Sequence, residues 1–334
     1  MEPIREATAS CCSEQRRWAA SLGPMHSTPP PRAVILATLA CVVAAFCWGL
    51  SAVIAKGAFE RGLSPERMAE SRVVVALIPL AAYLIVRRRD LLRPPPAARP
   101  ALLLFGVAIV AVNFSYYLAI DRLDVGVAIS LQYTAPVLVL VGTAVVARQA
   151  PGGLSWLAAG LTLIGAVLVS GAYAGLASVD GIGLAAGIAA AVTYGTYLIS
   201  AEAAGRRGTH PATSLFIGFV VAAVIWSVAL PLWDWPLELL TDPEVALRVL
   251  GVGLLGTLIP FLLAVAALRV ISAAVAAIAS STEPVFASAL AWLLLGQELS
   301  ALQLLGGALI VTAIVIAQLR RLPAASAAPV EVAP

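Results

Sequence analysis

The chain has 334 residues, of which 61% are hydrophobic and only 12% are charged, and its mean hydropathy is +0.96. A soluble domain would carry about 25% charged residues, so the composition predicts an all-α integral membrane protein. The net charge of +3 is small and its basic residues are scattered over short loops, which gives no basis for nucleic-acid binding.

Side chains that build disulfides and metal sites are scarce. Cys11 and Cys12 are adjacent in a polar N-terminal region, and Cys41 and Cys47 lie on one expected helix, too far apart along its axis to bridge. The chain has only two histidines and no P-loop. We therefore expect no disulfide framework, no metal site, no cofactor and no ATP hydrolysis.

Residues 1–33 are expected to form a disordered tail, with Met25 as an alternative start of translation, and residues 320–334 a second tail. Between them the charges delimit ten apolar runs, most of them near the roughly 20 residues that cross a bilayer. The second run is irregular, because Arg72 and Glu70 must enter the membrane or reach back to its surface. The ten expected spans are 34–56, 66–86, 101–120, 125–147, 154–171, 181–202, 212–232, 248–268, 273–295 and 301–319.

The distribution of arginines predicts that both termini are cytoplasmic. With the N-terminus inside, the inner segments hold fifteen arginines and the outer loops four, as cytoplasmic loops of membrane proteins prefer. Glu202 and Arg206, four residues apart near an inner end, are expected to form a surface pair. The abundance of Ala and Arg with a single Lys points to a GC-rich bacterium, and hence to its cytoplasmic membrane.

The two halves of the chain resemble each other. A shift of 148 positions places Thr134 on Thr282 and Pro136 on Pro284, and a shift of 146 aligns Gly, Arg and Pro residues in and just after the first helix of each half. Five helices per half is an odd number, so the second half enters the membrane from the opposite side. This predicts ten transmembrane helices as two inverted five-helix repeats, a common plan of secondary transporters. The expected repeats are residues 34–171 and 181–319.

Four segments resemble helices of the drug/metabolite transporter superfamily, most closely those of its EamA group. They are AFCWGLS at 45–51, the segments 119–137 and 267–291, and LLGGALIVTAIV at 304–315. The resemblance covers about residues 34–319. It implies ten helices, two five-helix repeats and export of small metabolites, and it says almost nothing about the substrate.

Glu283 is the only charge in the apolar run from Val270 to Gln297. A charged carboxylate at this depth costs about 2.5–3.5 kcal/mol on insertion scales. One interpretation is that it contacts an amine-bearing substrate or takes up a proton. The other is that it is a protonated structural carboxyl bonded across helices. The repeat weighs against a symmetric structural role, because the counterpart of Glu283 is Ala135.

Two polar residues are expected near Glu283, one on its own helix and one on the equivalent helix of the first half. Gln132 shares a face with Pro136, and Ser280 shares one with Glu283. We expect the two helices to meet at the repeat interface and to line a central cavity, although such groups also join helices for about 0.6–2 kcal/mol. Pro136 and Pro284 are expected to shape these helices and to expose backbone carbonyls.

Other membrane-depth residues complete the expected binding site. Trp48, Tyr194 and Tyr197 lie mid-span and would form aromatic walls, or alternatively pack within the protein or against lipid. Asn113 would line the site or join helices. Arg72 matches an arginine commonly seen early in the second helix of the resembled family, and it would hold a substrate carboxylate, pair with an acidic residue, or extend to the outer headgroups.

These observations favour a secondary transporter that moves a small polar metabolite by alternating access. An amino acid or related amine is the favoured substrate, export the favoured direction and protons a candidate coupling partner. A facilitative permease or channel for another solute is the alternative. A membrane enzyme is disfavoured, because no expected span contains a histidine or a close acidic pair. The expected partners are the substrate and the bilayer, for a monomer or homodimer.

Overall fold

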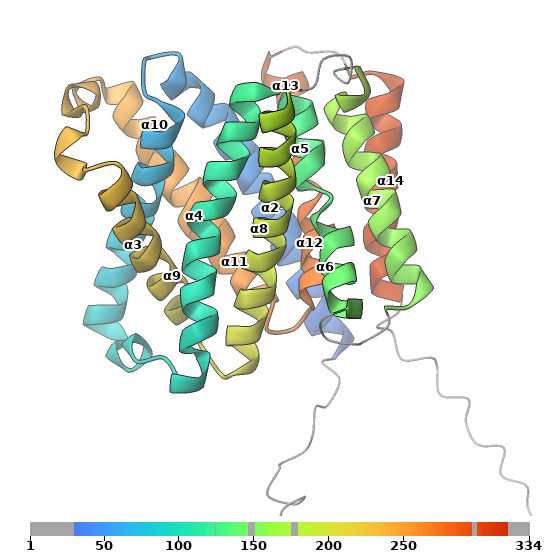
Figure 1. Ribbon diagram of the computed structural model, residues 1–334, viewed down its shortest axis with the longest axis horizontal. Helices are drawn as coiled ribbons and strands as arrows, with labels where there is room; N and C mark the ends of the chain where they lie inside the picture. The colour runs from blue at the N-terminus through green and yellow to red at the C-terminus, as the bar shows by residue number, and fades with distance from the viewer. Residues whose placement is uncertain (1–29, 124, 146–150, 175–179, 296–298, 320–334) are drawn as a thin grey trace, which may run out of the picture.

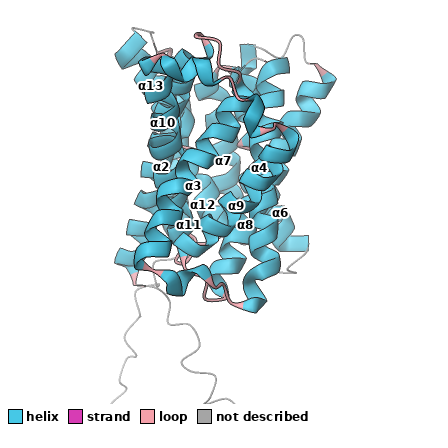
Figure 2. Cartoon of the chain, turned by 90° about the vertical axis from the view of Figure 1, so that its left-hand side faces the viewer, coloured by secondary structure: helices cyan, strands magenta, loops and turns pink. Residues whose placement is uncertain are grey.

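The computed structural model describes residues 30–123, 125–145, 151–174, 180–295 and 299–319, and every regular element within them is helical (Figure 2). The helices run side by side in one bundle, and the described chain begins and ends at the same end of it (Figure 1). The helices are α2 (Pro31–Phe59), α3 (Pro65–Arg87), α4 (Arg99–Arg122), α5 (Val125–Gln132), α6 (Ala135–Val145), α7 (Gly153–Ser170), α8 (Gly181–Arg206), α9 (Pro211–Ala229), α10 (Pro243–Gly253), α11 (Ile259–Ala267), α12 (Ala273–Ser280), α13 (Glu283–Leu295) and α14 (Ala301–Leu319). Short 3-10 turns lie between them: η1 (Arg89–Leu92), η2 (Pro96–Ala98), η3 (Ala172–Ala174), η4 (Leu232–Asp234) and η5 (Leu237–Thr241).

Eight helical segments in the described part of the chain are long and apolar enough to cross a membrane. Two further apolar helices are shorter, at Val127–Gly142 and Ala301–Ala317. The expectation of a helical membrane protein is therefore confirmed. The expected tail 320–334 and residues 1–29 of the expected tail 1–33 lie outside the described residues, and α2 begins at Pro31, inside the expected tail. Proline suits the first position of a helix, because the amide hydrogen that it lacks would have no partner there.

Two of the expected spans, 125–147 and 273–295, are not continuous helices. The first breaks between α5 and α6, and the second between α12 and α13. The helices α5 and α12 start at Val125 and Ala273, 148 positions apart, and they end at the same spacing. At both breaks a threonine hydroxyl donates to a backbone carbonyl three residues earlier, at 2.7 Å for Thr134 and 2.8 Å for Thr282.

A proline follows each break at the second position of the next helix. Proline has no amide hydrogen, so Pro136 cannot donate to the carbonyl of Gln132, and Pro284 cannot donate to that of Ser280. Both breaks therefore leave backbone acceptors without their usual helical donor in the middle of the bundle.

A third interruption lies in the segment Pro243–Ala267. There the π-helical turn η6 (Leu254–Leu258) joins α10 to α11, and the amide of Ile259 donates to the carbonyl of Leu254. Pro260 follows, so the carbonyl of Gly256 also loses its α-helical donor. Such turns widen a helix locally and recur at functional sites.

The two halves of the chain are packed into each other. The first helix of the first half, α2, contacts α10, α11, α12 and α13 of the second half. Likewise α8, the first helix of the second half, contacts α4, α5 and α6 (Figure 1). The largest buried apolar cluster lies between these crossing helices, so it belongs to both halves together.

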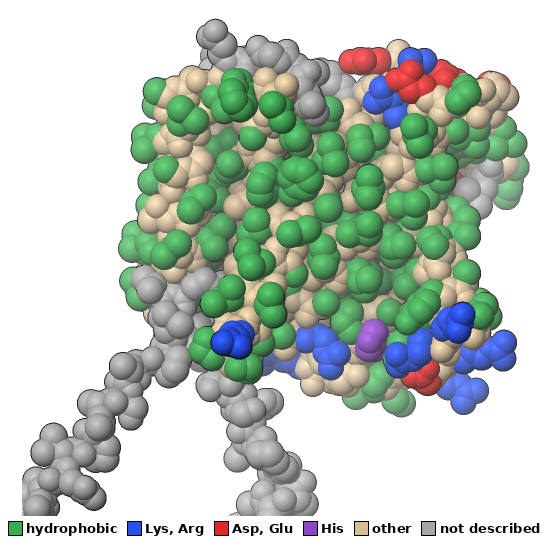
Figure 3. Space-filling view, turned by 180° about the vertical axis from the view of Figure 1, so that it is seen from behind, with side chains coloured by type: hydrophobic (Ala, Val, Ile, Leu, Met, Phe, Trp, Pro, Cys, Tyr) green, Lys and Arg blue, Asp and Glu red, His purple; other side chains and the backbone are tan. Residues whose placement is uncertain are grey.

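Charged side chains gather at the two ends of the bundle, and hydrophobic side chains cover the middle (Figure 3). At the end of the bundle where α2 begins, Glu202 forms the expected pair with Arg206 and also contacts α12. Its Oε1 accepts from Arg206, but its Oε2 accepts from the backbone amide of Ala273 at 2.8 Å. Glu202 therefore caps the N-terminus of α12, where a carboxylate is favoured.

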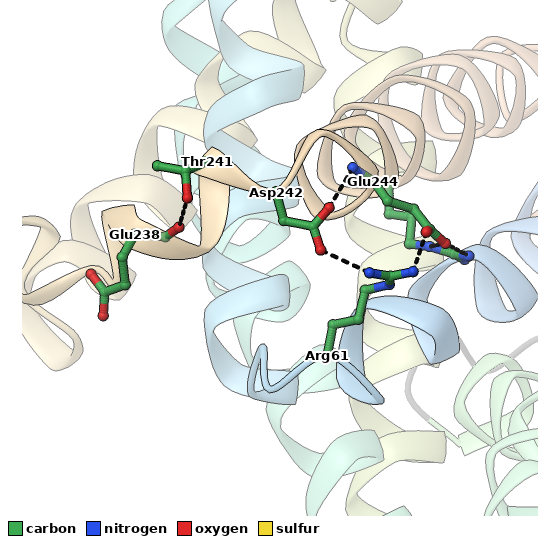
Figure 4. A network of polar contacts seen from close by, with 6 residues as sticks. Arg61, Glu238, Thr241, Asp242 and Glu244 are labelled. Carbon is green, nitrogen blue, oxygen red and sulfur yellow. Dashed lines mark hydrogen bonds and ion pairs between the residues drawn. The ribbon is translucent and has the colours of Figure 1, made fainter.

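An ion-pair network at the other end ties α2 to α10 (Figure 4). Arg61 Nη1 lies 2.8 Å from Asp242 Oδ2, and Arg61 also pairs with Glu244. Arg248 pairs with Glu244 and donates from Nη1 to the carbonyl of Ile54 at 3.1 Å. Gly57 leaves the room for this, because a Cβ there would lie 2.2 Å from Arg248 Nη1.

Asp242 makes the stability of this end depend on pH. The backbone amide of Glu244 and the guanidinium of Arg61 lower the pKa of Asp242 below its usual value. Its charge therefore stabilises the fold above the unfolded-state pKa, and this contribution is lost as pH falls through the folded-state pKa. We expect Asp242→Asn to melt at a lower temperature than the wild type at pH 7, and the difference to shrink at about pH 3. Thermal melts of the variant and the wild type in the same detergent, at both pH values, measure this difference in melting temperature. A difference that does not depend on pH would contradict the prediction.

Candidate functional site

Glu283 lies at the point where the two broken helices meet. It is the first residue of α13, and the hydroxyl of Tyr133 donates to its Oε2 at 2.6 Å. Tyr133 stands in the other break, between α5 and α6, and only 2% of it is exposed. The bond joins two residues 150 positions apart. The second carboxylate oxygen, Oε1, has no hydrogen-bond partner within the described part of the chain.

Several polar side chains surround this carboxylate. Arg72, Tyr116 and Tyr194 are close enough to Glu283 to interact with it electrostatically. Tyr194 also faces Ser280, the last residue of α12. The structure thus gathers residues from α3, α4, α5–α6, α8 and α12–α13 around one carboxylate.

Arg72 points into the bundle, not toward the outer surface. Its Nε donates to Thr257 Oγ1 at 2.8 Å, and its Nη2 donates to the carbonyl of Gly256 at 2.6 Å. Its Nη1 lies 3.5 Å from Asn113 Oδ1. The guanidinium is therefore held against the π-helical turn η6, and the structure brings together Arg72 and Asn113, two of the residues expected from the sequence.

The expected aromatic residues join one cluster through Phe261. Trp48 meets Phe261 edge-on at 5.6 Å between ring centroids, and Tyr197 meets Phe261 at 5.5 Å. Tyr194 and Tyr197 stack at 5.8 Å. Tyr197 is 1% exposed and lies in the core, Tyr194 is also buried, and Trp48 is half-buried. Of the three, Trp48 has the most side-chain surface free of protein contacts.

Gln132 and Ser280 occupy equivalent places at the ends of α5 and α12. The amide oxygen of Gln132 is buried and accepts no hydrogen bond from the described residues. Asn113 donates from Nδ2 to the carbonyl of Ile109 in its own helix, at 2.6 Å, while its oxygen faces Arg72. The part of the chain that the structure describes contains no cluster of three His, Cys, Asp or Glu residues that could hold a metal ion.

Sequence reasoning missed Tyr133, Thr257, Gly256 and Phe261. A usable signal existed for Tyr133, because it precedes Thr134 and its counterpart under the 148-residue shift is Ser281, so both breaks carry a hydroxyl. Thr257 and Gly256 gave no such signal, since their role depends on a π-helical turn that hydropathy does not reveal.

Comparison with known proteins agrees with this architecture. The model of the EamA-like transporter family matches the chain twice, at residues 35–171 and 181–318. A solved crystal structure superimposes with a TM-score of 0.72 at 19% sequence identity, covering 85% of this chain and 97% of that one. At this identity the likeness concerns the fold alone.

The curated relatives are transporters. The threonine/homoserine exporter RhtA of Escherichia coli K12 is 27% identical over 219 residues, which cover 64% of this chain and 69% of RhtA. Uncharacterized transporters of Synechocystis and Archaeoglobus fulgidus are 29% and 28% identical over 202 and 228 residues, covering 60% and 66% of this chain and 60% and 77% of the relatives. The expectation of a membrane transporter that is not an enzyme is thereby confirmed. The chain belongs to the EamA-like transporter family, within the drug/metabolite transporter superfamily.

Proposed function

We propose that the protein exports an amine-bearing small metabolite, an amino acid or a close relative, across a bacterial cytoplasmic membrane by alternating access. The observation that carries the proposal is the carboxylate of Glu283, with one oxygen bonded to Tyr133 and the other unbonded within the described residues. A carboxylate placed in this way at the meeting point of two broken helices suits an ammonium group. The name of the relative RhtA, an exporter of threonine and homoserine, supports an amino acid as the class of substrate and export as the direction.

The proposed architecture is ten transmembrane helices in two inverted five-helix repeats. Counting the two shorter apolar helices with the eight long ones gives ten. The family model matches each half once, and the breaks of the two halves are 148 positions apart. Two similar halves of opposite orientation can exchange conformations, which would open the site first to one side and then to the other.

The proposed orientation places both termini in the cytoplasm. Basic side chains gather at the end of the bundle where α2 begins and α14 ends, and the mixed acidic and basic network of Arg61 and Asp242 lies at the opposite end (Figure 3). Cytoplasmic loops of membrane proteins are rich in arginine and lysine.

Exchange in proteoliposomes tests the proposal. Vesicles loaded with L-threonine and diluted into radiolabelled L-threonine are expected to accumulate label faster than protein-free vesicles. A panel of other amine-bearing and uncharged solutes then defines the class. Exchange of uncharged solutes without exchange of any amine-bearing one would refute the proposal.

Proton coupling is tested in the same vesicles. If Glu283 takes up the coupled proton, an imposed pH gradient accelerates transport by the wild type and has no effect on Glu283→Gln. An equal response to the gradient in both proteins assigns the coupling elsewhere, and no response in the wild type indicates facilitated diffusion.

A further inference from the structure

We infer that Arg72, held by the π-helical turn η6, forms a carboxylate-binding subsite opposite Glu283, so that the protein recognises a zwitterion by both of its charges. The inference rests on the proposed function, because it takes the amine of the substrate to lie at Glu283.

The first step concerns the charge of Arg72. Its bonded neighbours are a hydroxyl, a backbone carbonyl and an amide oxygen, all of them neutral. No carboxylate lies within salt-bridge distance of it among the described residues. An arginine inside a membrane protein is costly unless its charge has a partner, and it marks a substrate or ion path by default. Glu283, its electrostatic partner, is not in contact with it.

The second step concerns the hydrogen bonds that remain. A guanidinium carries five N–H donors, and the bonds to Thr257, Gly256 and Asn113 use three of them. The contact with Asn113 is long, at 3.5 Å, and is therefore weak. The remaining donors belong to Nη1 and Nη2, the pair that binds a carboxylate with two parallel hydrogen bonds.

The third step concerns how the guanidinium is positioned. The carbonyl of Gly256 is available because Pro260 has no amide hydrogen to offer it. The hydroxyl of Thr257 donates to the carbonyl of Val252 at 2.9 Å and so presents a lone pair to Arg72 Nε. A Cβ at position 256 would lie 2.0 Å from Ser51 Oγ, so α2 packs directly against this turn. One side of the guanidinium is thus fixed by the π-helical turn, while one donor on each of Nη1 and Nη2 has no hydrogen-bond partner among the described residues.

The site therefore presents one anionic and one cationic group. A simple amine would satisfy Glu283 and leave Arg72 without a partner, whereas an α-amino acid with a free carboxylate satisfies both. A site built to bind a charged group rejects the analogue that lacks it, because its own buried polar group is then unpaired.

Binding of L-threonine and of L-threoninamide, in which the carboxylate is replaced by a neutral amide, tests the inference on purified protein. The wild type is expected to prefer threonine by about 10- to 100-fold, as a bidentate charged pair would give. In Arg72→Gln the preference is expected to fall to about one, through loss of affinity for threonine alone. Arg89→Gln is the control and retains the preference, because it removes an exposed arginine of η1 whose one side-chain bond among the described residues goes to the carbonyl of Ile85 in α3.

Thr257→Val and Thr257→Ser form a second pair, for use if Arg72→Gln does not fold. The valine variant removes the acceptor of Arg72 Nε and is expected to lower the preference, and serine, which keeps the hydroxyl, restores it. A wild type that binds threonine and threoninamide equally overturns the inference and leaves the proposed function standing. The inference is also overturned if the preference for threonine survives in Arg72→Gln, or if that variant loses affinity for both ligands equally. A wild type that binds neither ligand, nor any other amine, contradicts the proposed function itself.

Discussion

Glu283→Gln is expected to weaken binding of an amine-bearing substrate by about 10- to 100-fold and to reduce transport accordingly. A hydrogen bond to a charged group contributes about 1.5–3 kcal/mol, and glutamine keeps the shape of glutamate while losing its charge. The amide oxygen of glutamine can still accept the hydrogen bond from Tyr133, so the contact between the two helix breaks is retained. Titration of the purified variant with L-threonine, together with exchange in proteoliposomes, measures both effects.

Two variants show whether the effect belongs to this carboxylate. Glu66→Gln removes an exposed carboxylate in the first turn of α3 and is expected to bind and transport like the wild type. Tyr133→Phe removes the hydroxyl that orients Glu283, and we expect a smaller loss, about 3- to 10-fold, as for one ordinary hydrogen bond. Wild-type affinity and transport in Glu283→Gln would show that the carboxylate has a structural role only.

Gly306→Val is expected to destabilise the protein by about 3 kcal/mol, near the upper end of the cost of overpacking. A Cβ at position 306 would lie 2.7 Å from the carbonyl oxygen of Gly165, and a Cβ at position 165 would lie 2.7 Å from the carbonyl oxygen of Gly306. These two glycines bring the backbones of α7 and α14 into direct contact. Backbone atoms cannot rotate away as a side chain does, so the helices must separate.

A glycine in the same helix pair provides the matched control. Gly160 lies in α7 with open space where a Cβ would be, so Gly160→Ala is expected to leave the melting temperature unchanged or to raise it. Alanine favours a helix over glycine by about 0.5–1 kcal/mol. Thermal melts of the two variants in the same detergent make the comparison. Equal melting of Gly306→Val and the wild type would mean that α7 and α14 are not in close contact.

The helical membrane class was predictable from the sequence because a soluble fold rarely contains so many long apolar runs between charges. Glu283 was also conspicuous, since it is a lone acidic residue in such a run. The helix breaks were harder to place. Pro136 and Pro284 pointed to irregular helices, but proline at that position permits a kink, a break or a normal first turn. Which one occurs depends on packing against the other half of the chain.

The partners of the site residues were not predictable for a related reason. Mid-membrane aromatics such as Tyr197 look the same in sequence whether they face a substrate, a lipid or the core, because all three environments accept an apolar ring. Arg72 finds Gly256 and Thr257 only because a π-helical turn presents them, and they lie more than 180 residues away along the chain. Local sequence carries no information on such long-range contacts.

The exchange of first helices between the halves has a consequence for how the protein can be assembled and how it could have arisen. Because α2 packs among α10–α13 and α8 packs mainly against α4–α6, each half made alone lacks the main surface against which its first helix folds. In the proposed inverted arrangement, a gene cut between the halves would yield a working protein only if both fragments were produced in one membrane, in opposite orientations. The same requirement applies to an ancestral gene encoding a single half: its product would have needed to insert both ways up and pair with an inverted copy of itself. Fusion of two such copies would have removed that requirement and allowed the two equivalent positions to differ, as Glu283 and Ala135 do.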